Sequence, residues 1–128
     1  KPFLILMADD LYKKEDLEKL LDFPNAILTW KTSNPERFGI SRVNSEGFLE
    51  ALIEKPSQPC GNLAYTGACV LDKKIFFEPI IYGSNNEELL APMIGVLAQK
   101  RPVKVVWASF WFPIGYPEDL ERAEKLYG

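Results

Sequence analysis

The stretch FLILMADD, residues 3–10, decides the fold of this chain. Phe3 to Ala8 is a continuous apolar run without the alternation of a half-buried strand, and two aspartates follow it directly. An unbroken apolar run of this length is typical of a strand that is covered on both faces, as in a parallel sheet between helices. The run therefore predicts a buried strand that ends at Asp9 and Asp10.

Beyond this strand, helical and strand patterns alternate along the chain. Helices are predicted over residues 13–22, 72–82, 92–100 and 117–126, and strands over residues 26–31, 39–43, 48–54, 63–71 and 103–107. Residues 44–47 form a hairpin signal between two of these strands, and residues 110–115 are expected to form an aromatic loop. This order of elements predicts an α/β fold with a mixed sheet and flanking helices.

Composition excludes several classes of function. The chain has 128 residues, enough for one domain with a real core, and its net charge of −3 argues against a nucleic-acid surface. Its longest apolar run is far too short to cross a membrane, and no secretory signal is visible. Cys60 and Cys69 are expected to be free thiols, with a disulfide as the alternative, so a reducing, cytoplasmic location is predicted.

The chain contains no histidine. This removes the commonest general base and the usual zinc ligand. Any catalysis must then use carboxylates, lysine, backbone amides or a hard metal ion.

The predicted strand at residues 3–8 opens the chain, which raises the question of its neighbours in the sheet. A buried strand needs a partner on each edge, and a bare edge invites aggregation. Either a later strand pairs with it in the antiparallel direction, or another segment or chain supplies the neighbours. The second explanation predicts that residues 3–8 lie inside a sheet and that an N-terminal part is absent.

Two pairs of charged residues follow predicted strands. Asp9 and Asp10 lie where open α/β sheets bind ligands, and a carboxylate there can hold Mg²⁺ against phosphate oxygens. Glu54 can accept hydrogen bonds from sugar hydroxyls, and Lys55 can pair with a phosphate. The alternatives are that Asp10 only turns the chain and that Glu54 and Lys55 form a solvated ion pair.

Glycines and aromatic residues add further candidates. Gly39 and the segment Tyr65-Thr66-Gly67 allow the backbone to approach a ligand closely, although an ordinary turn also explains Gly39. The aromatic residues between 107 and 112 are more typical of a core or an oligomer contact than of a ligand platform. Each motif is weak alone, and the order and spacing of the motifs carry the information.

In this order the motifs resemble the C-terminal part of the sugar nucleotidyltransferase family, which includes glucose-1-phosphate thymidylyltransferases, glucose-1-phosphate uridylyltransferases and mannose-1-phosphate guanylyltransferases. The matching segments are LMADD at 6–10, ERFGI at 36–40, EGFLEALIEKPSQP at 46–59, NLAYTGACVLD at 62–72 and WFPIGYPEDLERA at 111–123. The resemblance implies a single domain over residues 1–128, the sugar-phosphate-binding half of a Rossmann-like nucleotide-diphospho-sugar transferase fold.

The resemblance also implies a role for each matching residue. Asp9 corresponds to a catalytic aspartate that binds the metal, and Lys55 to a catalytic lysine that meets the sugar phosphate. The implied substrate-binding residues are Asp10, Gly39, Glu54, Lys55, Tyr65 and Thr66. The implied cofactor is Mg²⁺, and the implied partners are a sugar 1-phosphate and a nucleoside triphosphate, joined into a nucleotide sugar with release of pyrophosphate.

Two departures from the family pattern concern the nucleotide and the metal. The glycine-rich loop that binds the triphosphate is absent, and Pro113 stands where the family has a second metal-binding aspartate. We therefore expect an N-terminal half or a second chain to complete the enzyme, a homo-oligomer, and no activity from the isolated chain. The alternatives are a non-catalytic sugar-phosphate-binding or regulatory module, and a structural fragment without a ligand.

Overall fold

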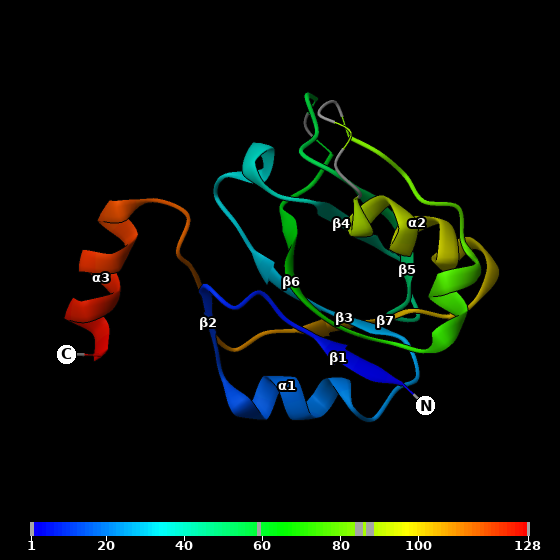
Figure 1. Ribbon diagram of the computed structural model, residues 1–128, viewed down its shortest axis with the longest axis horizontal. Helices are drawn as coiled ribbons and strands as arrows, with labels where there is room; N and C mark the ends of the chain where they lie inside the picture. The colour runs from blue at the N-terminus through cyan, green and yellow to red at the C-terminus, as the bar shows by residue number, and fades with distance from the viewer. Residues whose placement is uncertain (1, 59, 84–85, 87–88, 128) are drawn as a thin grey trace.

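The computed structural model describes residues 2–58, 60–83, 86 and 89–127 and has the predicted α/β architecture, with helices on both faces of a mixed sheet (Figure 1). The strands are β1 (Phe3–Ile5), β2 (Asp10–Tyr12), β3 (Ala26–Lys31), β4 (Ile40–Val43), β5 (Leu49–Ile53), β6 (Leu63–Leu71), β7 (Lys104–Trp107) and β8 (Trp111–Pro113). The helices are α1 (Lys14–Leu20), α2 (Leu90–Lys100) and α3 (Pro117–Tyr127), with short 3-10 turns η1 (Pro35–Arg37) and η2 (Lys73–Phe77).

The main sheet has the order β5-β4-β6-β3-β7, and β1 pairs with β6 beside this path. Strands β3 and β7 are parallel and the other pairs are antiparallel, which makes the sheet mixed. Strand β6 is the longest. It pairs with β3 along one edge, and with β4 and β1 at opposite ends of its other edge. The candidate site lies near the middle of β6, where β1 and β4 separate.

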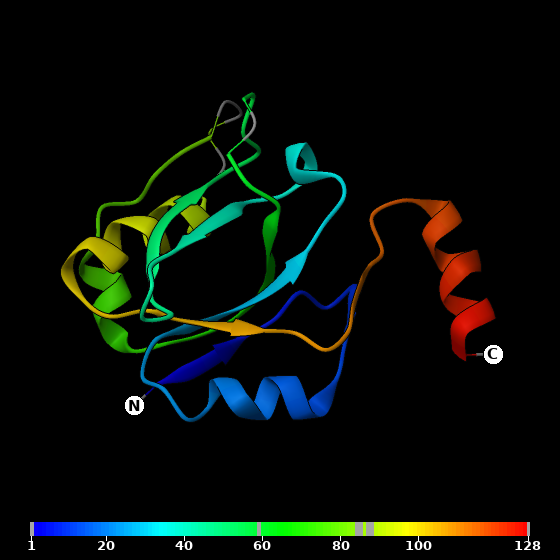
Figure 2. The same ribbon diagram turned by 180° about the vertical axis from the view of Figure 1, so that it is seen from behind.

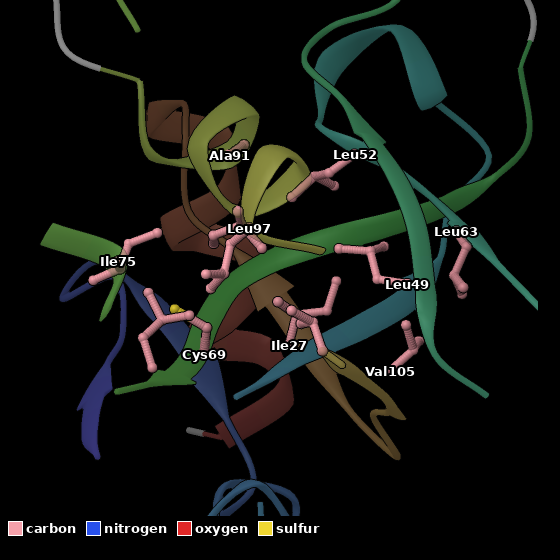
Figure 3. Close-up of a cluster of buried hydrophobic side chains, with 12 residues drawn as sticks. Ile27, Leu49, Leu52, Leu63, Cys69, Ile75, Ala91, Leu97 and Val105 are labelled. Carbon is pink, nitrogen blue, oxygen red and sulfur yellow. The ribbon is translucent and has the colours of Figure 1, made fainter. Parts of the chain in front are cut away.

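Each face of the sheet has its own core. Helix α2 covers one face, where Ile94 and Leu97 are fully buried against residues of β3, β5 and β6 (Figure 3). Helix α1 covers the other face with Leu20, which packs against Leu28 and Val70. Helix α3 extends away from the sheet in both views (Figures 1 and 2). Within the described ranges, no helix is long and apolar enough to cross a membrane.

The strand predicted over residues 3–8 is shorter and more exposed than expected. Strand β1 ends at Ile5, and Leu4, Leu6 and Met7 keep 39%, 42% and 49% of their surface exposed. A later strand, β6, pairs with β1 in the antiparallel direction, as one of the two explanations predicted. The other edge of β1 has no partner among the described residues. The strand at residues 3–8 was expected to be covered on both faces and both edges, and the described part of the chain does not cover it in this way.

Two local predictions are corrected. The helix predicted over residues 72–82 is only the turn η2: Asp72 caps it as expected by accepting from Lys74 N at 2.9 Å, but Pro79 lacks an amide hydrogen and does not continue it. Residues 110–115 are not simply a loop, because they contain β8, which pairs with the equally unpredicted β2. Helix α3 begins at Pro117 as predicted, whereas α2 begins two residues before Pro92. Cys60 and Cys69 are free thiols, as expected.

Candidate functional site

All of the predicted site residues line one open cavity of about 780 Å³. They are Asp9, Asp10, Gly39, Glu54, Lys55, Tyr65 and Thr66. They come from separate segments of the chain, and Pro113 lines the same cavity. The fold therefore brings together the residues that the motifs singled out, while their chemical roles remain predictions.

Asp10 is held by the short sheet of β2 and β8. In this sheet Asp10 lies opposite Pro113, and its two carboxylate oxygens accept hydrogen bonds from Trp111 Nε1 at 3.1 Å and Ile114 N at 3.4 Å. Burial raises the pKa of Asp10 and the charge of Asp9 raises it further, while the two hydrogen bonds oppose this. Asp10 therefore connects the two strands of this wall, so its role is at least partly structural.

Asp9 has a different environment. It lies in the turn before β2, its side chain is exposed, and it makes no hydrogen bond or ion pair with the described residues. Its carboxylate oxygens are therefore available at the rim of the cavity. The described residues contain no group of three or more histidine, cysteine or acidic side chains that could hold a metal ion.

Tyr12, which the sequence analysis did not single out, fixes the turn that carries Asp9. Its hydroxyl donates to the carbonyl oxygen of Thr66 at 2.8 Å and accepts from Met7 N at 3.4 Å. Gly67 makes this approach possible: its φ is +90°, and a Cβ there would collide with the Met7 side chain. The glycine of the Tyr65-Thr66-Gly67 segment thus admits the turn before β2, and Gly67 also lines the cavity, so close approach of a ligand there stays a prediction.

Thr66 and Tyr65 are adjacent in β6 but differ in how their hydroxyls are used. The buried Thr66 Oγ1 donates to the carbonyl oxygen of Leu28 at 2.9 Å and accepts from Ala68 N at 3.3 Å. The Thr66 hydroxyl therefore already donates and accepts a hydrogen bond within the fold. The hydroxyl of Tyr65 is buried and has no hydrogen-bond partner among the described residues.

The surroundings of Tyr65 make this orphaned hydroxyl notable. Burial raises its pKa, and the neighbouring thiol of Cys69 and carboxylate of Glu54 raise it further; the thiol lies beside the hydroxyl without good hydrogen-bond geometry. Burial also raises the pKa of Cys69, to about 11, so the thiol is neutral. Orphaned buried polar groups are rare, and each one costs stability.

Gly39 directly precedes β4, the strand that lies between β5 and β6 in the sheet. The carbonyl oxygen of Phe38 accepts from Lys55 N at 3.1 Å, and that of Gly39 accepts from Tyr65 N at 2.8 Å. A Cβ at Gly39 would lie 3.7 Å from Glu54 Oε2 and 3.6 Å from the Cβ of Ala91, both ordinary contacts. The fold itself therefore tolerates a methyl group here, and this group would occupy space beside the Glu54 carboxylate.

Lys55 has an unusual backbone. Its φ is +38°, in the left-handed region that few residues other than glycine adopt, and Pro56 follows it directly. Such backbone strain is concentrated at functional sites, where it positions a side chain. The Lys55 side chain is exposed at the cavity, so its ammonium group can reach a ligand there.

Arg37 and Tyr116, which the sequence analysis also missed, line the same cavity. The Arg37 guanidinium lies 4.8 Å from the centre of the Tyr116 ring and 5.6 Å from that of Phe38. Cation–π contacts of this kind hold a guanidinium in place. The signal for Arg37 was present in the motif ERFGI, next to Gly39, but only the fold brings Tyr116 to it.

Comparison with known proteins identifies the family. The nucleotidyl transferase family matches residues 1–128, and the chain belongs to this family. It is 32% identical over 126 residues to the bifunctional protein GlmU of Methanocaldococcus jannaschii, covering 96% of this chain and 31% of that protein. It is 33% identical over 104 residues to a bifunctional sugar-1-phosphate nucleotidylyltransferase/acetyltransferase of Sulfurisphaera tokodaii, covering 79% of this chain and 26% of that protein.

Solved structures agree on the fold. The chain matches apo UDP-glucose pyrophosphorylase with a TM-score of 0.86 and 21% identity, over 99% of this chain and 54% of that one. A glucose-1-phosphate thymidylyltransferase from Bacillus anthracis matches with a TM-score of 0.79 and 20% identity, over 98% and 54% of the two chains. The predicted fold class is confirmed, and the chain spans about a third of the curated relatives above or less, and about half of these solved chains.

Proposed function

We propose that this chain is the sugar-phosphate-binding part of an enzyme that joins a sugar 1-phosphate to a nucleoside triphosphate, giving a nucleotide sugar and pyrophosphate. The observation that carries the proposal is the cavity that collects the predicted residues. Tyr65 lines it, and its buried hydroxyl, which has no hydrogen-bond partner among the described residues, is proposed to bond the bound sugar. The family membership and the sugar-phosphate activity named for the relative from Sulfurisphaera tokodaii support it.

In this proposal the sugar 1-phosphate lies across the cavity. Lys55 pairs with its phosphate, and Glu54 accepts hydrogen bonds from its hydroxyl groups. An anionic phosphate oxygen then attacks the α-phosphorus of the triphosphate in line, and pyrophosphate leaves with the electron pair of the broken bond. No general base is needed because the nucleophile is already anionic, so the absence of histidine is consistent with this reaction.

Mg²⁺ is the proposed cofactor, and Asp9 is its proposed ligand. The exposed Asp9 carboxylate suits a hard cation that takes one or two carboxylates together with substrate phosphates. Asp10 is less available, because Trp111 and Ile114 already donate to its carboxylate. Pro113 has no ligand atom in its side chain. The ion would neutralise phosphate charge during the transfer.

The triphosphate site is proposed to lie on another part of the enzyme, either an N-terminal half or a second chain. The uncovered edge of β1 and the exposed Leu4, Leu6 and Met7 support this, because a sheet edge with apolar side chains pairs readily with a further strand. In this proposal the other part carries the glycine-rich loop, so the isolated 128 residues do not turn over. A homo-oligomer and a cytoplasmic location stay predictions.

Calorimetry with glucose 1-phosphate tests the assignment of the cavity. A charged phosphate contact is worth about 1.5–3 kcal/mol, so Lys55→Ala should weaken binding by about tenfold or more. Lys73→Ala is the matched control, because Lys73 is exposed on η2 and lines none of the cavities described. Equal effects of the two substitutions would refute the role of Lys55.

A non-catalytic sugar-phosphate-binding or regulatory module is the second candidate, and Pro113 is the observation that favours it. The two candidates differ once a nucleotide-binding half from a relative is supplied in cis or in trans. An enzyme fragment should then release pyrophosphate, and Pro113→Asp should raise its rate or lower its Mg²⁺ requirement. No turnover from the complemented chain, with or without Pro113→Asp, would favour the binding module.

A further inference from the structure

A second cavity, of about 240 Å³, adjoins the candidate site. The two cavities share Arg37, Phe38, Trp111 and Pro113, so these residues form a common wall between them. The charged residues that line the second cavity are Lys31, Arg37, Asp119 and Arg122. We refer to this cavity as the basic cleft.

The charge of the basic cleft is opposite to that of its surroundings. Three cationic residues and one carboxylate give its lining a net charge of +2, whereas the whole chain carries −3. The candidate site next to it is lined by three carboxylates and two cationic residues. A local positive potential on an acidic protein attracts anions to that position.

The single carboxylate of the cleft does not neutralise it. Asp119 Oδ2 accepts hydrogen bonds from Gly115 N and Tyr116 N, both at 3.0 Å, and its Oδ1 lies 3.5 Å from Arg122 Nη1. These contacts occupy Asp119 at the start of α3. Lys31 and Arg37 form no ion pair with any residue that the structure describes.

Aromatic rings help to position both guanidinium groups, and the ion pair with Asp119 also holds that of Arg122. Arg37 lies over the Tyr116 ring, and Arg122 lies 5.3 Å from the centre of the Phe112 ring. Stacking on a ring face orients a guanidinium without using its N–H donors. The donors of Arg37, and those of Arg122 that do not face Asp119, therefore remain available for an anion between α3 and the loop that follows β3.

We propose that the basic cleft is an anion site for a small phosphoryl anion, of which inorganic pyrophosphate is the best fit. Guanidinium groups match phosphoryl oxygens with paired hydrogen bonds, and Lys31 adds a compact charge. The cleft is small beside the candidate site, about 240 Å³ against about 780 Å³, which suits a free diphosphate better than a complete nucleotide. The proposal is independent of the sugar-phosphate assignment, which depends on Lys55 and not on the cleft.

Calorimetric titration of the full chain with inorganic pyrophosphate tests the proposal. Arg37 is left unchanged because it lines both cavities, and the test variants are Lys31→Gln and Arg122→Gln, which alter only the cleft. Each should weaken pyrophosphate binding about five- to tenfold, less at high salt because the side chains are exposed. The matched controls are Lys73→Gln and Arg42→Gln, which remove the same charges from exposed surface outside both cavities. Each control should change the affinity for pyrophosphate less than twofold.

Each alternative result overturns the proposal. The absence of measurable pyrophosphate binding, or equal losses in test and control variants, would mean that the cleft has no specific anion site. Loss of pyrophosphate binding in Lys55→Ala, with none in Lys31→Gln or Arg122→Gln, would move the anion to the candidate site. A nucleoside diphosphate titrated in parallel should bind no more tightly than pyrophosphate, and tighter binding would contradict the assignment to free pyrophosphate.

Discussion

Replacing Tyr65 with phenylalanine should move stability and ligand binding in opposite directions. The substitution removes only the buried hydroxyl, which has no hydrogen-bond partner among the described residues. Leaving such a group unsatisfied costs about 1–3 kcal/mol, so Tyr65→Phe should raise the free energy of unfolding by about 1–2 kcal/mol. For a domain of this size that is a rise of roughly 2–8 °C in Tm.

Binding of a sugar 1-phosphate should weaken in the same variant. A neutral hydrogen bond contributes about 0.5–1.5 kcal/mol, so its loss corresponds to roughly a 2- to 12-fold weaker Kd. A hydroxyl with a purely structural partner would give the reverse pattern, with lower stability and unchanged affinity. Thermal unfolding of the ligand-free protein and calorimetry with glucose 1-phosphate measure the two quantities separately.

Tyr12→Phe is the matched control for this experiment. Tyr12 also carries a partly buried hydroxyl, but that hydroxyl donates to the carbonyl oxygen of Thr66 at 2.8 Å. Its removal should lower the free energy of unfolding by about 1 kcal/mol, the usual net value of such a bond. If Tyr65→Phe lowers stability as Tyr12→Phe does, the Tyr65 hydroxyl has a partner within the fold and the reasoning is refuted.

Two further substitutions test the site. Gly39→Ala should leave the unfolding free energy within about 1 kcal/mol, because its Cβ meets only ordinary contacts, yet weaken sugar 1-phosphate binding beside Glu54; unchanged affinity would contradict this. Burial raises the pKa of Asp10, so the folded protein holds this proton more tightly than the unfolded chain does. The contribution of Asp10 to the free energy of unfolding is therefore greatest below the usual aspartate pKa and is lost as pH rises through the raised value. Asp10→Asn should therefore flatten that part of the stability curve in urea unfolding at a series of pH values, and an unaltered slope would contradict the shift.

The strands with strong local signals could be predicted from the sequence. The hairpin turn at residues 44–47 joins β4 and β5 as expected, and its Gly47 has a φ of +89°. The long apolar segment of β6 lies in the middle of the sheet with helices on both faces. These predictions succeed because hydrophobic pattern and turn chemistry act over a few neighbouring residues.

The short β2–β8 sheet could not be predicted, although it positions Asp10. Each strand has three residues, too few to show a period, and the hydrogen bond from Trp111 to Asp10 joins residues 101 positions apart. The roles of Tyr12 and Gly67 are equally non-local, because each depends on the turn before β2 meeting β6. The sequence thus indicated which residues gather at the site, but not which of their polar groups form hydrogen bonds within the fold.

The apolar run at residues 3–8 is where the sequence and the isolated chain disagree most. Its composition predicts burial on both faces, yet Leu4, Leu6 and Met7 remain substantially exposed. A hydrophobic pattern reflects the surface that a segment buries in its functional state, and an uncovered apolar edge is unfavourable in water. The proposed second part of the enzyme removes the disagreement, because a strand paired along the open edge of β1 would cover these side chains.

Pro113 and Asp10 face each other across β2 and β8, so the residue at position 113 also affects the stability of this small sheet. An aspartate at position 113 would place a carboxylate directly opposite Asp10, and like charges in such a pair destabilise a sheet. Asp10 already has a pKa raised by burial and by Asp9, so a third carboxylate would add to the same repulsion. A cation held between the carboxylates would relieve it. Proline at this position therefore suits a site that stays folded without Mg²⁺, and the complementation experiment with Pro113→Asp has to be read across a Mg²⁺ series for this reason.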